Sequence, residues 1–331
     1  MDKNIKELMN ENVLKEASSK FGIKFHDLKF IGGFQNFIYE YKINDKYYIL
    51  RITHSSHRTE NTVLGEIEFV NYLYKNGLSV SKPVFSVNKK LIEIIILEDY
   101  YFIITSFEKA LGKKLKYPEA MNNDCLSELC GEITGLMHKL SSEYNPLNEI
   151  IKRHTWKDNY YIKNFEKYIP KDQKKVYDSF RILIEEIEKL KIENYGLIHG
   201  DINIGNFLID ENKITLFDFD ECQYSWFVED IAIQLFYIIY VVLDDSIPER
   251  NEQSEKFLNF FLKGYKKYFK INDYEIEKIP LFLKLREIIV YVGLHRSMDF
   301  NNMHDFFKSY IKQSRNRIEN RAAIFEGVKN I

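Results

Sequence analysis

The chain has 331 residues, and this length predicts either two domains or one domain built as two lobes around a sizeable core. Its 47 Lys and Arg residues nearly balance its 49 Asp and Glu residues, so the formal net charge is only −2. Because such a surface generates no strong electrostatic field, we expect neither nucleic acid nor a membrane as a partner, and a small molecule fits better.

Residues 1–20 are charged throughout and lack the apolar core of a secretory signal, so they predict an amphipathic helix. The three cysteines, Cys125, Cys130 and Cys222, show no metal-ligand spacing, which predicts reduced thiols in a cytoplasmic protein. The longest apolar stretch, residues 231–243, contains a glutamine and is shorter than the roughly 20 residues that span a bilayer. It therefore predicts a buried helix.

Strand patterns dominate the first third of the chain. Runs rich in β-branched and aromatic residues predict strands at residues 28–33, 36–43, 46–53, 83–87, 91–96 and 100–107. Turn-forming pairs separate several of these runs, which favours an antiparallel sheet. A single helical pattern interrupts them in residues 62–77, where apolar residues recur at helical spacing and Gly77 can end the helix.

Helical patterns dominate the remainder of the chain. Apolar residues mark one face of a helix at residues 126–140 and of another at residues 176–190. Short strand patterns interrupt the helices only at residues 196–200, 207–210 and 213–220.

The polar and turn-rich segment 108–116 separates these two regions. We therefore expect residues 1–108 to form an N-terminal helix and a β-rich lobe, and residues 109–331 to form a hinge and a helical lobe. This is a bilobal α+β architecture, for which a ligand site in the cleft between the lobes is expected.

Polar side chains lie at the ends of predicted strands in residues 197–220, which read LIHGDINIGNFLIDENKITLFDFD. Asp201 can accept the proton of an attacking hydroxyl group. The side-chain oxygens of Asn206 and Asp218 can bind a Mg²⁺ ion that bridges the phosphates of a nucleotide. These residue types at this spacing predict phosphoryl transfer.

The segment HGDINIGN, residues 199–206, resembles the HGDxxxxN catalytic loop of the aminoglycoside phosphotransferase and choline kinase superfamily, whose members are relatives of the protein kinases. The resemblance implies a bilobal protein-kinase-like fold, with Mg²⁺ as cofactor and ATP or GTP as co-substrate. It also implies that Asp201 is the catalytic base, that Asn206 is a metal ligand, and that Asp218 has the role of the aspartate in the DFG motif. His199 would support the loop.

Asp220 stands where the glycine of the DFG motif would be. Since alternate residues of a strand share a face, we expect Asp218 and Asp220 to point toward the same site. There, Asp220 would touch a second metal ion or the acceptor. The alternative is an exposed carboxylate at the end of the strand.

Residues closer to the N-terminus resemble the nucleotide-binding parts of the family in the same order. Gly32 and Gly33 are similar to the loop that covers the phosphates, although a plain hairpin turn is the alternative. Arg51 occupies the position where most kinases have a phosphate-binding lysine. The resemblance implies Glu66 as its ion-pair partner, with Glu68 as the fallback.

The family also implies a site for the adenine base and two structural residues. Residues 106–109 would form a hinge whose backbone reads the edge of the base, and three apolar side chains would sandwich the ring. The residues implied are Ser106, Phe107 and Glu108 for the hinge, and Ile49, Leu208 and Phe217 for the ring. Asp230 resembles an aspartate that hydrogen-bonds the catalytic loop from a helix N-terminus, and His138 resembles a structural histidine.

The hydroxyl acceptor stays open, and an aminoglycoside, an amino alcohol or a sugar-like molecule would all fit. The scattered candidates for its site are Trp156, Tyr224, Trp226, His295 and Arg296. Acids and aromatic residues also gather just after the last catalytic strand, namely Asp220, Glu221, Tyr224, Trp226 and Glu229. Such a group suits a cation, so it predicts an alcohol that bears an amine, whereas simple packing is the alternative.

Two other functions compete with a small-molecule kinase. A protein serine/threonine kinase is one, although no segment resembles an activation loop with an APE end. A non-catalytic relative that keeps the fold, as in some spore-coat proteins, is the other. Such proteins often lose the base or a metal ligand, whereas this chain retains both. The sequence indicates no oligomeric state.

Overall fold

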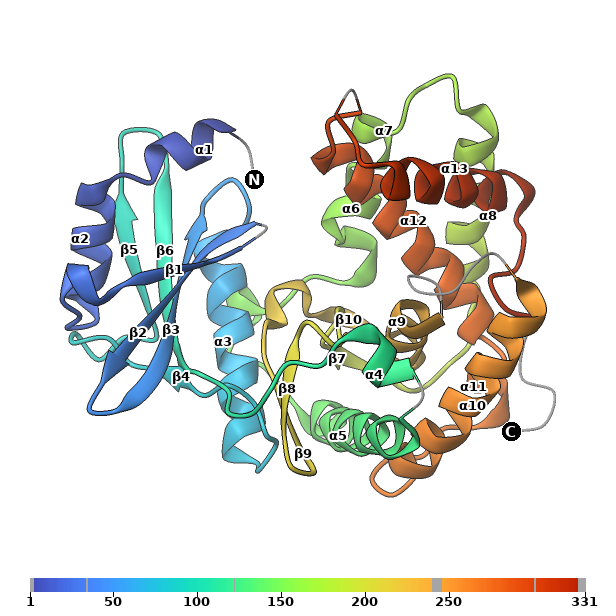
Figure 1. The fold of residues 1–331 in the computed structure, drawn as a ribbon, viewed down its shortest axis with the longest axis horizontal. Helices are drawn as coiled ribbons and strands as arrows, with labels where there is room; N and C mark the ends of the chain where they lie inside the picture. The colour runs from blue at the N-terminus through green and yellow to red at the C-terminus, as the bar shows by residue number, and fades with distance from the viewer. Residues whose placement is uncertain (1–2, 34, 122, 240–245, 301, 327–331) are drawn as a thin grey trace. The chain divides into compact units, whose positions relative to one another are not determined.

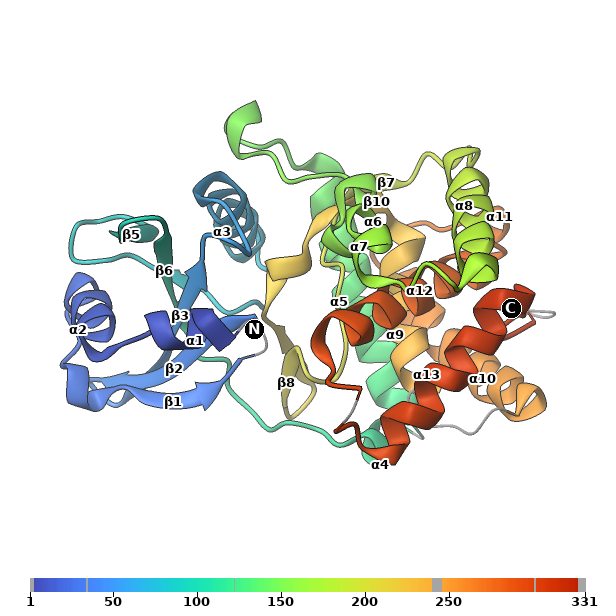
Figure 2. The same cartoon turned by 90° about the horizontal axis from the view of Figure 1, so that it is seen from above.

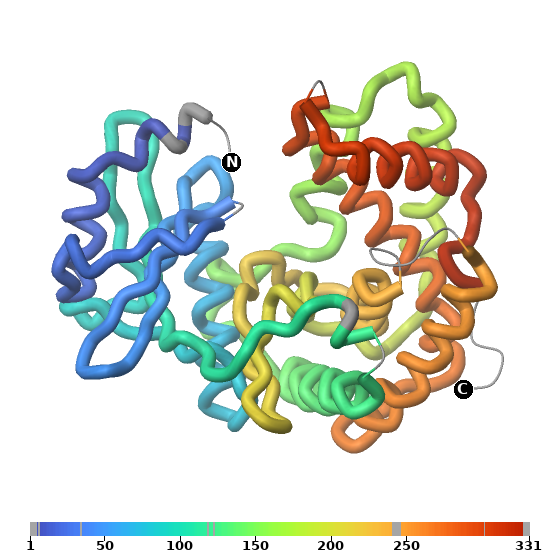
Figure 3. Tube along the Cα trace, viewed as in Figure 1, coloured from blue at the N-terminus to red at the C-terminus, as the bar shows by residue number. Residues whose placement is uncertain are grey.

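The computed structural model describes residues 3–33, 35–121, 123–239, 246–300 and 302–326 (Figures 1 and 3). The chain forms two compact units. The first comprises Met1–Gly112, Tyr144–Arg153 and Thr215–Asp220, and the second comprises Lys113–Glu143, His154–Ile214 and Glu221–Ile331. Two segments from the middle of the chain thus pack with the N-terminal residues.

A six-stranded antiparallel sheet is the centre of the first unit (Figure 1). Its strands are β1 (Lys29–Gly32), β2 (Asn36–Ile43), β3 (Lys46–His54), β4 (Pro83–Val84), β5 (Ile92–Ile96) and β6 (Tyr101–Glu108). They follow the order β1-β2-β3-β6-β4, and β5 also pairs with β6. The predicted antiparallel sheet is confirmed, although the strand expected at residues 83–87 ends at Val84.

Helices cover both faces of this sheet (Figure 1). They are α1 (Lys3–Leu8) and α2 (Glu11–Lys20) on one face, and α3 (Glu60–Lys75) on the other. Because side chains alternate along β6, Phe102 and Ile104 pack toward α2, whereas Ile103 packs toward α3. The single helix expected at residues 1–20 is divided, since the Asn10 side chain caps the start of α2.

The second unit is mainly helical (Figures 2 and 3). Its helices are α4 (Tyr117–Met121), α5 (Asp124–Glu143), α6 (Tyr160–Lys163), α7 (Phe165–Tyr168), α8 (Lys174–Glu188), α9 (Phe227–Ile239), α10 (Ile247–Tyr265), α11 (Asp273–Ile276), α12 (Ile279–Ser297) and α13 (Asp305–Asn320). The predicted helices at residues 126–140 and 176–190 correspond to α5 and α8. In this unit α12 packs against α9, α8 and α13.

Four short strands accompany these helices: β7 (Tyr195–Ile198), β8 (Phe207–Asp210), β9 (Lys213–Leu216) and β10 (Gln223–Trp226). β7 pairs with β10, and β8 pairs with β9. The buried helix expected at residues 231–243 is α9, in which every residue except Tyr237 is buried; residues 240–243 lie outside the described residues. In the part of the chain that the structure describes, no helix is long and apolar enough to cross a membrane.

Candidate active site

The loop between β7 and β8 is held in place by the first turn of α9. Asp230 accepts hydrogen bonds from the backbone N–H groups of His199 and Gly200, each at 2.9 Å, as predicted. The buried His138 lies behind Asp230, with its Nε2 3.2 Å from an Asp230 oxygen and its Nδ1 2.8 Å from the Tyr265 hydroxyl group. Its position supports the structural role predicted for it.

Gly200 allows the loop to turn sharply. Its φ is +78°, and a Cβ atom there would lie 2.3 Å from the carbonyl oxygen of Glu221. Only glycine fits such a position without a backbone shift. The turn brings the next residue, Asp201, to the surface of the loop, where its side chain is 26% exposed.

Three side chains contact the Asp201 carboxylate. Asn206 donates from Nδ2 to Asp201 Oδ2 at 3.0 Å and to the Asp201 carbonyl oxygen at 2.9 Å. Arg286, from α12, forms an ion pair with Oδ1, and the Tyr237 hydroxyl group lies 3.4 Å from the same oxygen. Burial raises the pKa of the Asp201 carboxyl, and the charge of Arg286 opposes this rise. A carboxylate held at both oxygens suits a general base.

Asn206 fits the role of a metal ligand in its chemistry. Because its amide nitrogen donates to Asp201, its amide oxygen is the atom that remains for a hard cation. The sequence did not predict a role for Arg286 or Tyr237, because each is an ordinary member of a helical pattern and no local signal marks it.

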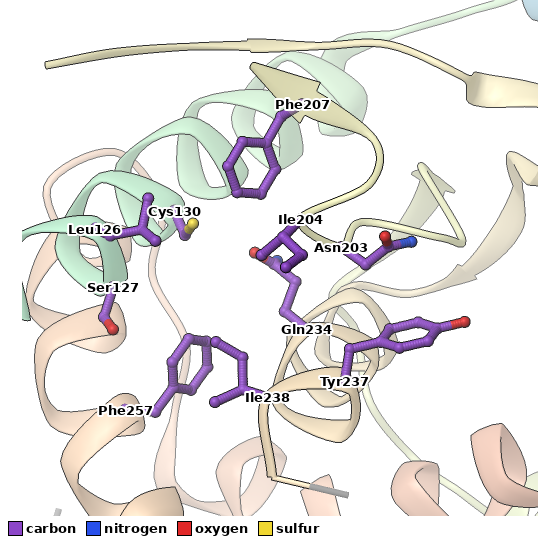
Figure 4. Close-up of a pocket in the computed structure, with 10 residues that line it drawn as sticks. All are labelled: Leu126, Ser127, Cys130, Asn203, Ile204, Phe207, Gln234, Tyr237, Ile238 and Phe257. Carbon is purple, nitrogen blue, oxygen red and sulfur yellow. The ribbon is translucent and has the colours of Figure 1, made fainter. Parts of the chain in front are cut away.

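A small cavity of about 20 Å³ lies beneath this loop (Figure 4). It is lined mainly by apolar side chains, among them Ile204, Phe207 and Phe257, with Cys130 and Gln234 beside them. A space of this size holds at most a water molecule. The side chains around this cavity therefore support the loop, and the cavity itself is too small for an acceptor.

In the first unit, the predicted ion pair between Arg51 and Glu66 is present. β3 places Arg51 on the face of the sheet that α3 covers, where Nη1 and Nη2 bond the two Glu66 oxygens at 2.7 and 2.8 Å. Both side chains are buried, and the guanidinium group also lies over the Phe107 ring. The fallback, Glu68, instead accepts hydrogen bonds from the Tyr144 hydroxyl group and the Leu147 N–H group.

Gly32 is the last residue of β1 and Gly33 follows it, between β1 and its antiparallel partner β2, so the hairpin interpretation describes their local structure. Their φ angles are +128° and +132°. A Cβ atom on Gly33 would lie 1.9 Å from the Asn36 carbonyl oxygen, so this backbone requires glycine. Whether the loop also covers phosphates stays a prediction.

The expected hinge is the end of β6. Ser106 is buried, and its hydroxyl group bonds Tyr41 and the carbonyl oxygen of Ile49. The N–H groups of Glu108 and Lys109 donate to carbonyl oxygens of this unit, so neither is available to a base in this conformation. The three residues predicted to sandwich the ring, Ile49, Leu208 and Phe217, are half-buried.

The structure contradicts the prediction that Asp218 and Asp220 share a strand face. β9 ends at Leu216, Asp218 has a φ of +64°, and a 3₁₀ turn covers Phe219–Glu221. Because strict alternation requires an extended backbone, the two side chains differ: Asp218 is exposed, whereas Asp220 is buried. An exposed Asp218 remains suitable as a metal ligand.

Asp220 belongs to a buried polar network within the first unit. Its carboxylate accepts from Arg58 Nε at 3.1 Å and lies 2.6 Å from His57 Nε2, and Asn36 Nδ2 is 3.4 Å away. Its carbonyl oxygen accepts from Arg58 and Arg153. Burial alone would raise the pKa of Asp220, but the charges of Arg58 and His57 hold this pKa well below its usual range. Sequence reasoning missed these partners.

The predicted cation-binding group is also contradicted. Trp226 is buried against Trp156, Tyr195 and Phe282, with ring centroids 5.5 to 5.7 Å apart. Glu229 is buried too, bonded to Gln223 and Ser225, and burial raises its pKa to about 7. These side chains therefore face the interior rather than a ligand.

The remaining acceptor candidates are engaged in contacts within the protein. Tyr224 is half-buried, and its N–H and carbonyl groups are hydrogen-bonded. Arg296 lies over the Tyr160 ring at 4.5 Å, and burial lowers the pKa of His295 to about 4. None of these contacts marks a ligand site.

The chain is similar to known proteins along both of its units. The model of the phosphotransferase enzyme family matches residues 27–268. The chain is 35% identical to amicoumacin kinase of Bacillus subtilis (strain 168) over 329 residues, which cover 97% of this chain and 96% of that protein.

Solved structures agree with this result. Amicoumacin kinase hAmiN, in complex with AMP-PNP, Ca²⁺ and Ami, is 32% identical with a TM-score of 0.92, covering 99% of this chain and 98% of that one. A microcompartment-associated aminopropanol kinase shares the fold, with 17% identity and a TM-score of 0.74 over 94% of this chain and 97% of that one. The predicted fold class is confirmed.

Proposed function

Since the chain belongs to the phosphotransferase enzyme family and is a kinase with an alcohol group as acceptor, we propose that it transfers the γ-phosphoryl group of ATP to amicoumacin. The likeness to two amicoumacin kinases along nearly the whole chain carries this proposal. AMP-PNP, bound by one of these relatives, favours ATP over GTP as the donor. The three free cysteines are consistent with a protein that works in the cytoplasm.

We assign the general base to Asp201. An acceptor hydroxyl group would donate its proton to this carboxylate while its oxygen bonds the γ-phosphorus, and the bond to the β-phosphate oxygen would break to release ADP. The partial exposure of Asp201 and its hydrogen bonds from Asn206 support the assignment. Arg51, paired with Glu66, would supply positive charge for the phosphates.

We assign the divalent cation to Asn206 and Asp218, whose side chains offer oxygen atoms that suit Mg²⁺. When bound, the cation would neutralise charge on the phosphates. The Ca²⁺ ion bound by the amicoumacin kinase relative supports a divalent site in this protein. A protein kinase and a non-catalytic protein gain no support from relatives named for small molecules.

The direct test is a phosphotransfer screen with the full-length protein. ATP and GTP are each combined with amicoumacin, an aminoglycoside, choline, 1-amino-2-propanol, a neutral sugar and a peptide substrate. We expect ADP release and addition of one phosphoryl group to amicoumacin, measured by mass spectrometry, with ATP as the better donor. Modification of another acceptor in preference to amicoumacin would contradict the proposed substrate, and modification of the peptide alone would favour a protein kinase.

Replacing Asp218 by Asn should weaken binding of the Mg²⁺–nucleotide complex and lower activity together. Asn tolerates the left-handed backbone of Asp218, so the change removes charge with little added strain. Titration of Mg²⁺ at fixed ATP should show a higher half-saturating concentration than in wild type. The matched control is Glu211→Asn, which removes an exposed carboxylate from another left-handed position. Equal Mg²⁺ dependence in Asp218→Asn and the control would contradict the assignment, as would stoichiometric zinc in the purified protein.

A further inference from the structure

α12 directs one cation toward the proposed base. Arg286 is 8% exposed, and its Nη2 both contacts Asp201 Oδ1 and donates to the Tyr237 hydroxyl group at 2.6 Å. Its Nη1 lies 3.3 Å from the carbonyl oxygen of Gly200. All of these groups belong to the second unit. Arg286 therefore reaches the carboxylate, the loop backbone and α9 with one guanidinium group.

The surroundings of Arg286 are unusual for a residue that only stabilises the fold. Its Nε is buried and makes no hydrogen bond within the residues that the structure describes. A buried donor without an acceptor is costly, so the position is not optimised for stability. Its ring contact with Tyr237, at 5.1 Å, fixes the plane of the guanidinium group instead.

The Asp201 carboxylate is held through both of its oxygen atoms. Asn206 donates to Oδ2, whereas Arg286 contacts Oδ1, so rotation of the carboxylate would break one contact or the other. Each carboxylate oxygen can accept more than one hydrogen bond, and the side chain is still 26% exposed. An acceptor hydroxyl group can therefore approach a carboxylate whose orientation is already set.

We propose that Arg286 is a positioning residue for phosphoryl transfer, which holds the Asp201 carboxylate in one orientation together with Asn206. This proposal rests on the proposed function of Asp201 as the base. It assigns to Arg286 a role in turnover and none in binding the acceptor or the nucleotide. A misplaced catalytic group can slow a reaction by about 10²-fold, which sets the size of the expected effect.

The test uses Arg286→Met and Arg286→Lys, with Lys284→Met as the control. Lys284 lies on the same helix and bonds the carbonyl oxygen of Arg321, away from Asp201. We expect Arg286→Met to lower kcat by roughly 10- to 100-fold with KM for ATP and for the acceptor little changed. The Arg286→Lys variant should recover little of the lost kcat, because an ammonium group cannot reproduce the planar fork of the guanidinium group. Added guanidinium, at a concentration that does not denature the control, should recover part of the loss in Arg286→Met.

Two results of these activity measurements would overturn the proposal. One is a raised KM for the acceptor at unchanged kcat, which would make Arg286 a binding residue. The other is a loss that guanidinium does not rescue, accompanied by altered circular dichroism, which would make it a residue of the fold.

A second measurement does not depend on the reaction. In urea unfolding, a cycle of Asp201→Asn, Arg286→Met and the double variant should show non-additive changes in the folding equilibrium constant of about 2- to 150-fold. If wild type phosphorylates no acceptor, the proposed function fails, and this cycle still decides the contact. Additive changes would overturn the positioning role by themselves.

Discussion

Replacing Asp201 by Asn is expected to lower kcat by about 10²- to 10⁴-fold while KM for ATP stays nearly unchanged. The amide cannot accept the proton of the acceptor hydroxyl group, whereas it keeps the shape of the carboxylate. Nucleotide binding relies on other residues and should survive. Initial rates at saturating acceptor, with ATP varied, measure both constants.

The appropriate control is Asp210→Asn, because Asp210 is an exposed carboxylate at the end of β8. Asp210→Asn changes the net charge by the same amount as Asp201→Asn. It should leave kcat within about twofold of wild type, as for most surface substitutions. The fold of Asp201→Asn is checked by circular dichroism, since the amide would present an N–H group to Arg286 or Asn206. Wild-type turnover in a folded Asp201→Asn protein would exclude Asp201 as the base.

Replacing Glu66 by Gln should be among the most damaging single changes in the first unit. It leaves the buried guanidinium group of Arg51 without its carboxylate, and breaking a buried ion pair in this way typically costs about 3–5 kcal/mol. We also expect weaker nucleotide binding, because Arg51 would lose the partner that orients it. Urea unfolding gives the first quantity, and calorimetric titration with AMP-PNP gives the second.

Tryptophan fluorescence is not a suitable probe of unfolding here, because both tryptophans, Trp156 and Trp226, lie in the second unit. Circular dichroism, or hydrogen exchange of β2 and β3, reports on the first unit directly. The matched control is Glu68→Gln on the same helix, whose carboxylate accepts from Tyr144 and Leu147 at a half-buried position. A loss of stability no larger than in this control would contradict the importance of the Arg51–Glu66 pair.

Local sequence determined the elements and much of the site. The hairpin of β2 and β3 follows from two runs of β-branched and aromatic residues around Asn44 and Asp45, which both adopt positive φ. The HGDxxxxN spacing and the family resemblance were sufficient to predict Asp230 as the anchor of the loop and Glu66 as the partner of Arg51. Both contacts join residues of different elements, 31 and 15 positions apart, so it was the resemblance to the family, and not local periodicity, that predicted them.

Tertiary structure decided which polar side chains meet, and it overturned one inference from periodicity. Asp218 and Asp220 differ in burial because a left-handed residue and a 3₁₀ turn replace the expected strand. Arg286 meets Asp201 across 85 positions of sequence, and Arg58 meets Asp220 across 162. Hydrophobic periodicity shows which face of a helix is buried, but only the packing of whole elements determines which side chains that face brings together.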